Sequence, residues 1–274
     1  MPEAAPVLRI GRTDFYIFAG LPEGDITQSG AEVLVSSAGT DATMSSGVSK
    51  AIQQKGGEEI LSGLRAHAPL TPGNVVITSA GKLGAKNIYH AIVVGWGDKR
   101  RVLQASVWRA VSRCMELAQL TGMTSIAFPS LGTGKGGAER YETHSTMAAA
   151  CLDAIRPDSS LRRILFCFDY ADTGQTFRTA FLQQRLIRQA RGLAVADDTE
   201  QAQLTDNLAK LWPALLGLHV NVEKLAVLVE QLERNPSAAV INYHIGDIIG
   251  STGWRLASAR GRWFVRMADI LNHL

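Results

Sequence analysis

Glycine and serine gather in two turns of this 274-residue chain. The first turn, Ser36-Ser37-Ala38-Gly39-Thr40, follows an apolar run and leads through Ser45-Ser46-Gly47-Val48 into a helical pattern. The second turn, residues 129–137, also follows an apolar run and holds four glycines between positions 132 and 137. Glycine lets the backbone approach a ligand and point successive N–H groups at one anion. Both turns are therefore candidate phosphate-binding loops, although the first taken alone is equally compatible with a serine-capped loop that binds nothing.

The second turn also matches two known nucleotide-binding motifs in part. Gly132, Gly134 and Gly137 fit the G-x-G-x-x-G spacing of a dinucleotide-binding Rossmann domain. The acidic residue that this motif requires about 20 residues later falls in a helical region, so a Rossmann domain remains the alternative interpretation. A P-loop does not fit, because Lys135 is followed by Gly136 where that motif needs Ser or Thr.

Strand-sized apolar runs alternate with helical patterns over the first two thirds of the chain. The runs are rich in β-branched residues and bounded by Gly, Pro or Ser, and they predict strands at residues 15–18, 33–35, 75–77, 88–94, 126–128 and 164–168. Apolar spacing of 3.6 residues predicts helices within residues 102–120, 147–154 and 177–186. This alternation predicts a central sheet covered by helices on both faces, with ligands binding at the carboxyl ends of its strands.

The pattern changes after Leu193. Residues 194–203 are short, polar and acidic, and we expect a linker. Residues 204–274 keep helical spacing without strand signals, so we expect a small all-α domain after an α/β domain at residues 1–193. Three tryptophans, Trp212, Trp254 and Trp263, favour a role in self-association or docking of a protein partner. The basic stretch 254–266 could touch nucleic acid, but a solvated helix face with buried tryptophans is favoured.

Composition excludes several classes of function. The net charge is +3, which implies no strong field for nucleic acid or a membrane. No apolar run reaches the ~18–20 residues that cross a bilayer, and no signal peptide is visible, so we expect a cytoplasmic protein. The three cysteines form no C-x-x-C pair, and the histidines have no ligand spacing, so we expect no metal.

The order of the motifs along residues 15–185 resembles that of the macro domain family. The motifs are Gly24-Asp25-Ile26-Thr27, the strand with Ser36-Ser37-Ala38-Gly39, the Ser46-Gly47-Val48 turn, Ile88-Tyr89-His90, Ile126-Ala127-Phe128-Pro129 with the glycine-rich turn, and Phe168-Asp169. This family binds ADP-ribose and related nucleotides on a three-layer α/β/α fold. The resemblance implies such a fold with a mixed central sheet, an ADP-ribose-type ligand or ADP-ribosylated target, and no separate cofactor.

The resemblance also implies a set of ligand-binding residues. Asp25 would accept the adenine amino group beside Ile26, and Phe168 would lie against the adenine. The Ser45–Val48 turn would lie at the diphosphate near the distal ribose, and residues 130–137 would wrap the diphosphate with backbone N–H groups. The expected ligand-binding residues are Asp25, Ile26, Ala38, Gly39, Ser45, Ser46, Gly47, Val48, Ser130, Leu131, Gly132, Thr133, Gly134, Lys135, Gly136 and Phe168.

This chain departs from the family pattern at the distal ribose. Family members usually read Asn-Ala-Ala-Asn where this chain has Ser36-Ser37-Ala38-Gly39, and a triple glycine is reduced to Ser45-Ser46-Gly47. The last Asn appears in hydrolytic members, so Gly39 favours binding over hydrolysis of an ADP-ribosyl bond or an ADP-ribose derivative. No residue is assigned a catalytic role. Sensor-like macro domains of bacterial defence systems also depart from the motif, which fits recognition of an NAD-derived signal that the helical tail relays to a partner.

Overall fold

The computed structural model describes residues 5–95, 102–134, 137–156 and 158–190. Its elements follow the order β1 (Leu8–Ile10), β2 (Thr13–Ala19), the 3-10 turn η1 (Ile26–Gln28), β3 (Val33–Gly39), α1 (Gly47–Gly56), α2 (Glu58–Arg65), β4 (Val75–Ser79), β5 (Asn87–Val94), α3 (Gln104–Leu120), β6 (Ser125–Phe128), α4 (Arg140–Ala154), β7 (Arg163–Phe168) and α5 (Ala171–Ala190). The chain divides into units Met1–Ala180 and Phe181–Leu274. The predicted linker 194–203 and helical domain 204–274 lie outside the described residues.

A seven-stranded mixed sheet forms the centre of the first unit, with the order β1-β2-β7-β6-β3-β5-β4. The five inner strands β2, β7, β6, β3 and β5 pair in parallel, whereas the edge strands β1 and β4 are antiparallel to their neighbours. All the predicted strands are present, because their apolar residues are buried within the sheet. The predicted α/β fold with a mixed sheet is confirmed.

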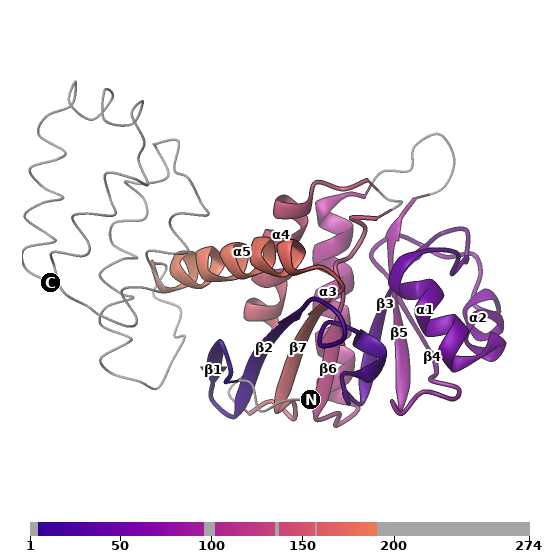
Figure 1. Ribbon diagram of the computed structural model, residues 1–274, viewed down its shortest axis with the longest axis horizontal. Helices are drawn as coiled ribbons and strands as arrows, with labels where there is room; N and C mark the ends of the chain where they lie inside the picture. Colours follow the sequence, from indigo (N-terminus) through magenta and orange to yellow (C-terminus); the bar gives the residue numbers. More distant parts are fainter. Residues whose placement is uncertain (1–4, 96–101, 135–136, 157, 191–274) are drawn as a thin grey trace, which may run out of the picture. The chain divides into compact units, whose positions relative to one another are not determined.

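Helices cover both faces of this sheet, and alternation along the strands assigns each face its partners (Figure 1). Leu34, Ile88 and Leu165 pack in one cluster with residues of α1 and α2, such as Ile52 and Ile60. The alternate residues of the same strands are also buried and face the layer of α3 and α4, so the strands are apolar on both sides. The result is a three-layer α/β/α arrangement.

Several elements extend beyond the bounds expected from the sequence, among them β3, β4 and α4. The strand predicted at 33–35 continues to Gly39, because Ser36, Ser37 and Ala38 keep pairing with β5 up to a register shift between Ala38 and Gly39. The helix predicted after Val48 ends at Gly56, because Gly57 takes a φ of +109° and a second helix, α2, begins at Glu58. Over the described residues, no helix is long and apolar enough to span a membrane.

Close packing ties the Gly24-Asp25-Ile26-Thr27 turn to the end of β7. Gly20 donates its N–H to the Phe168 carbonyl at 3.0 Å, and a Cβ on Gly24 would collide with the same carbonyl. Only glycine allows this approach, so the turn is held beside the last residues of β7.

Candidate functional site

A cavity of about 360 Å³ opens at the carboxyl ends of the inner strands. Most of its lining comes from four segments: residues 37–39 at the end of β3, residues 45–49 at the start of α1, residues 130 and 132–134 after β6, and residues 167–170 at the end of β7. Parallel strands end at the same edge of a sheet, so segments far apart in the sequence meet here. Both of the glycine- and serine-rich segments singled out from the sequence reach this one cavity.

The N-terminus of α1 reaches the cavity. Ser46 occupies the N-cap position, but its side chain makes no capping hydrogen bond, and its carbonyl accepts from the Ser49 hydroxyl at 2.7 Å. Gly47 has a φ of +54°, a left-handed conformation that glycine adopts at low cost. Ser46 thus does not make the serine cap expected as one alternative, and the N–H groups and dipole at a helix N-terminus attract anions.

Internal hydrogen bonds shape the glycine-rich turn opposite that helix. Gly132 donates its N–H to the Ser37 hydroxyl at 3.2 Å, which ties the turn to the end of β3. Gly132 and Gly137 have φ values of +72° and +64°, whereas Gly134 is not among the positive-φ glycines and a Cβ there would meet nothing within 4 Å. The backbone conformation therefore favours glycine at positions 132 and 137, whereas at position 134 the absence of a side chain leaves free space beside the backbone.

A buried histidine that the sequence did not single out as functional lies beneath this turn. The Nε2 atom of His144, on α4, is 2.8 Å from the Ser130 hydroxyl, which is itself 2.7 Å from the Thr133 hydroxyl. The imidazole is fully buried against the rings of Phe168 and Phe177. Burial, assisted by Arg140 and opposed by Glu139, lowers the pKa of His144 to about 4, so the ring is neutral at neutral pH.

A sequence model of the macro domain family matches residues 35–147. An uncharacterized protein of Pyrobaculum aerophilum is 34% identical over 59% of this chain and 89% of its own length. O-acetyl-ADP-ribose deacetylase 1 of Pantoea vagans is 30% identical over 54% of this chain and 89% of its own length. This chain belongs to the macro domain family. The matched relatives account for little more than its first half.

Solved macro domains share the fold. A macrodomain of Oceanobacillus iheyensis with ADP superposes with a TM-score of 0.56 and 21% identity, covering 63% of this chain and 92% of that one. A Trypanosoma brucei macrodomain in complex with ADP-ribose gives a TM-score of 0.53 and 19% identity, covering 64% of this chain and 76% of that one. These likenesses confirm the macro fold that the motif order implies.

Most of the residues expected from the macro resemblance line the cavity. They are Ala38, Gly39, Ser45, Ser46, Gly47, Val48, Ser130, Gly132, Thr133, Gly134 and Phe168. Leu131 is fully buried and does not line it, and Lys135 and Gly136 lie outside the described residues. The lining residues that the prediction lacked are Ser37, Asp41, Thr43, Ser49, Val94, Gly95, Arg140, Cys167, Asp169, Tyr170 and Thr173. Several of these directly adjoin predicted positions, which is the signal that could have found them.

Asp25 and Ile26 do not line the cavity. The Asp25 carboxylate accepts hydrogen bonds from Lys55 at 2.7 Å and from the backbone and hydroxyl of Thr27 at 3.0 and 2.6 Å. Burial alone would raise the pKa of Asp25, but the bonds from Lys55 and Thr27 outweigh it, and the pKa is lowered. Ile26 is packed in the core cluster on the α1–α2 face.

The end of β7 offers an aromatic side chain that the sequence-based prediction lacked. Phe168 is only 2% exposed and packs on Phe177, whereas Tyr170, two residues later, is 71% exposed at the cavity. Asp169 lies between them, and its pKa is raised by burial and by the nearby Asp25 carboxylate. An aromatic ring on a ligand therefore has an accessible partner in Tyr170 rather than in the face of Phe168.

A carboxylate stands next to the position where the family pattern has asparagine. A Cβ on Gly39 would lie 2.7 Å from Oδ1 of Asp41, so the Asp41 side chain takes up the space that a larger residue at 39 would need. Asp41 also accepts from the Thr43 N–H at 3.4 Å and lines the cavity. Asp41 therefore caps its own loop, and its carboxylate also reaches the site.

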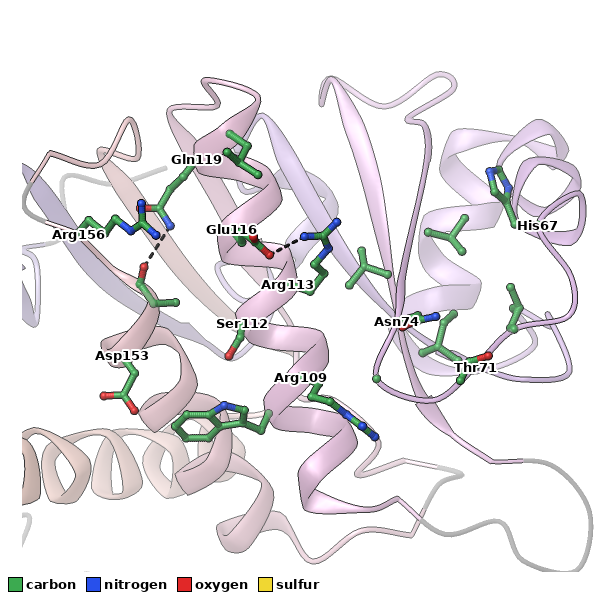
Figure 2. Close-up of a pocket in the computed structure, with 18 of the residues that line it drawn as sticks. His67, Thr71, Asn74, Arg109, Ser112, Arg113, Glu116, Gln119, Asp153 and Arg156 are labelled. Atoms are coloured by element: carbon green, nitrogen blue, oxygen red, sulfur yellow. Dashed lines mark hydrogen bonds and ion pairs between the residues drawn. The ribbon is translucent and has the colours of Figure 1, made fainter.

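A larger hollow, of about 1000 Å³, lies beside α3 and away from the glycine-rich turns (Figure 2). Its lining contains three arginines and three carboxylates: Arg109, Arg113, Arg156, Glu116, Asp153 and Asp158. Arg113 is paired with Glu116 at 2.6 Å, and no single sign of charge prevails. Although this hollow is larger, we do not assign the functional site to it, because neither the glycine-rich turns nor the N-terminus of α1 line it.

We predict that His144 makes the fold sensitive to acid. An unfolded histidine titrates near pH 6.5, whereas the pKa of the buried ring is about 4. Between these values only the unfolded state takes up the proton, so stability is complete above about pH 6.5 and is lost as the pH falls toward 4. Urea unfolding at about pH 7 and pH 4.5 should show a smaller acid loss in His144→Gln than in the parent. Equal losses in the two proteins would contradict the assignment.

Proposed function

We propose that the cavity binds an ADP-ribose-type nucleotide, either a free NAD-derived molecule or one attached to a target. The observation that carries the proposal is the pairing of a glycine-rich turn with the N-terminus of α1 across one cavity at the strand ends. Family members with the same fold have been solved with ADP and with ADP-ribose. Backbone N–H groups and a helix dipole suit a diphosphate, whose oxygens accept hydrogen bonds and carry negative charge.

The charged residues around the cavity favour different parts of the ligand at different places. Arg140 lines the cavity and pairs with Asp172 at 3.0 Å, but both side chains are largely exposed, so this ion pair costs little to break. Asp41 and Asp169 also line it, and these carboxylates suit hydroxyl or amino donors rather than phosphate. We therefore assign the diphosphate to the region between α1 and residues 130–134, with the distal ribose hydroxyls toward Asp41.

The adenine belongs beside the end of β7. An ionised carboxylate has about four acceptor positions, and Asp25 uses three of them on Lys55 and Thr27. One position remains for an exocyclic amino group, at the turn that Gly24 holds against Phe168. Tyr170 can stack on the base, and Lys55 keeps the Asp25 carboxylate ionised. Asp25 would thus recognise the base beside the end of β7, outside the residues that line the cavity.

Gly134→Val in the full chain tests this placement. The added side chain has no atom within 4 Å to collide with, so the fold is expected to be retained while the side chain occupies space at the cavity. We expect calorimetry to show ADP-ribose binding to the parent and a loss of at least about tenfold in the variant, because close approach of the phosphates is blocked.

Gly84→Val is the matched control. Gly84 also has open space around its Cβ position, it is not among the positive-φ glycines, and it does not line the cavity. Its variant should bind ADP-ribose as the parent does. A parent that gives no binding heat would overturn the proposed function, and parent-like affinity in Gly134→Val would place the diphosphate elsewhere.

Hydrolysis of an ADP-ribose derivative is the second candidate function. Relatives from Pantoea vagans and Escherichia fergusonii are named O-acetyl-ADP-ribose deacetylases, and Asp41 could orient a water beside Gly39. We favour binding, because Gly39 carries no side-chain amide to hold the distal ribose. Chromatography after incubating O-acetyl-ADP-ribose with the full chain should recover it unchanged. Release of acetate that Asp41→Asn abolishes would establish the hydrolase instead.

We further propose that residues 204–274 form a protein-interaction module that relays the liganded state. The support is in the sequence, where apolar residues recur at helical spacing with three tryptophans. Ending the chain after Leu193 should lower the number of chains per assembly in light scattering and leave ADP-ribose affinity within about twofold. The 166 residues that match in two relatives make up 89% and 90% of those proteins. Proteins of that size therefore contain little beyond the matched region, which supports independent folding of residues 1–193. Lost nucleotide binding with an unchanged number of chains per assembly would assign the tail to the ligand site.

A further inference from the structure

Three polar side-chain atoms form a series from the protein interior to the cavity. The fully buried Nε2 of His144 is 2.8 Å from the Ser130 hydroxyl, and that hydroxyl is 2.7 Å from the Thr133 hydroxyl. Ser130 and Thr133 line the cavity, whereas His144 does not. Ser130 is thus the link between a buried ring and a residue at the ligand.

The two hydrogen bonds that join His144, Ser130 and Thr133 can run in either of two directions. Each hydroxyl has one hydrogen, and a neutral imidazole has one protonated and one unprotonated nitrogen. In the outward direction, Nε2–H donates to Ser130, Ser130 donates to Thr133, and the Thr133 hydrogen is left for the cavity. In the inward direction, Thr133 donates to Ser130, Ser130 donates to Nε2, and only a lone pair of Thr133 faces the cavity.

Burial separates the His144 ring from other polar groups that could decide which of its nitrogens carries the proton. Its ring is held between Phe168 and Phe177, and its Nδ1 has no hydrogen-bond partner within the described part of the chain. No carboxylate orients Nδ1 there, so the arrangement lacks the third group of a nucleophilic triad. The pair of Ser130 and His144 is therefore suited to directing a hydrogen bond rather than to attacking a substrate.

We propose that His144 is a positioning residue that donates from Nε2 to Ser130 and thereby turns the Thr133 hydroxyl outward, where it donates to a phosphate oxygen of the ligand. This inference rests on the proposed nucleotide-binding function. Phosphate oxygens accept hydrogen bonds and cannot donate them when ionised, so only the outward direction gives Thr133 a bond to the ligand. His144 thus fixes from within the fold how many donors the glycine-rich turn offers to an anion.

A double-mutant cycle on the full chain tests the inference. ADP-ribose affinity is measured by calorimetry for the parent, Thr133→Val, His144→Leu and the double variant. Thr133→Val removes the outward donor with little change of shape, and His144→Leu removes the donor that directs it. We expect each single variant to bind about tenfold more weakly than the parent, and the double variant to bind no more weakly than Thr133→Val.

His144→Gln is the conservative variant, since its side-chain amide can supply an N–H near the position of Nε2. It should recover most of the affinity lost in His144→Leu. Long-range proton–nitrogen NMR spectra of the parent with ADP-ribose should show His144 protonated at Nε2 and not at Nδ1. This second measurement does not depend on whether His144→Leu folds.

Other results would contradict the role of His144 or the proposed function. Independent, additive losses in the cycle, or protonation at Nδ1 in the complex, would overturn the role of His144 while leaving nucleotide binding intact. Failure of His144→Gln to improve on His144→Leu would likewise reduce the histidine to a packing residue. A parent that does not bind ADP-ribose overturns the proposed function, and the inference falls with it.

Discussion

Parallel pairing of β3 with β5 on one side and β6 on the other is the constraint on which the site depends. Because β6 also pairs in parallel with β7, the carboxyl ends of these strands meet at one edge of the sheet. The segments that follow them supply the cavity lining, although residues 37 and 170 are far apart in the sequence. Burial of the strands on both faces makes this arrangement rigid, and the loops can therefore vary in chemistry without losing their positions.

A layer of internal hydrogen bonds connects this scaffold to the cavity. The Ser37 hydroxyl accepts from the N–H of Gly132, and His144 is hydrogen-bonded to the hydroxyl of Ser130. These two contacts fix the segment from Ser130 to Gly132. Lys55 and Thr27 likewise fix the carboxylate of Asp25, the proposed partner of the adenine. Groups held in this way lose little freedom when a ligand binds, which is how preorganisation contributes to affinity.

The sequence predicts the scaffold well, because burial in a sheet leaves a local record in the spacing of apolar residues. It also predicts the two turns, since their glycine and serine content is local. It does not predict partners that come from other elements. Lys55 reaches Asp25 across 30 positions, and His144 reaches Ser130 from α4, 14 positions along the chain, so neither contact has a signal in its own segment. Phe168 shows the same limit, because its burial against Phe177 could not be read from the end of a strand.

A crystal structure of the full chain with ADP-ribose tests the central claim most directly. The account predicts diphosphate density between the N-terminus of α1 and residues 130–134, with Thr133 Oγ1 within about 3 Å of a phosphate oxygen and the base near Asp25 and Tyr170. Density for the nucleotide in the hollow beside α3, or a diphosphate remote from both glycine-rich turns, would contradict it.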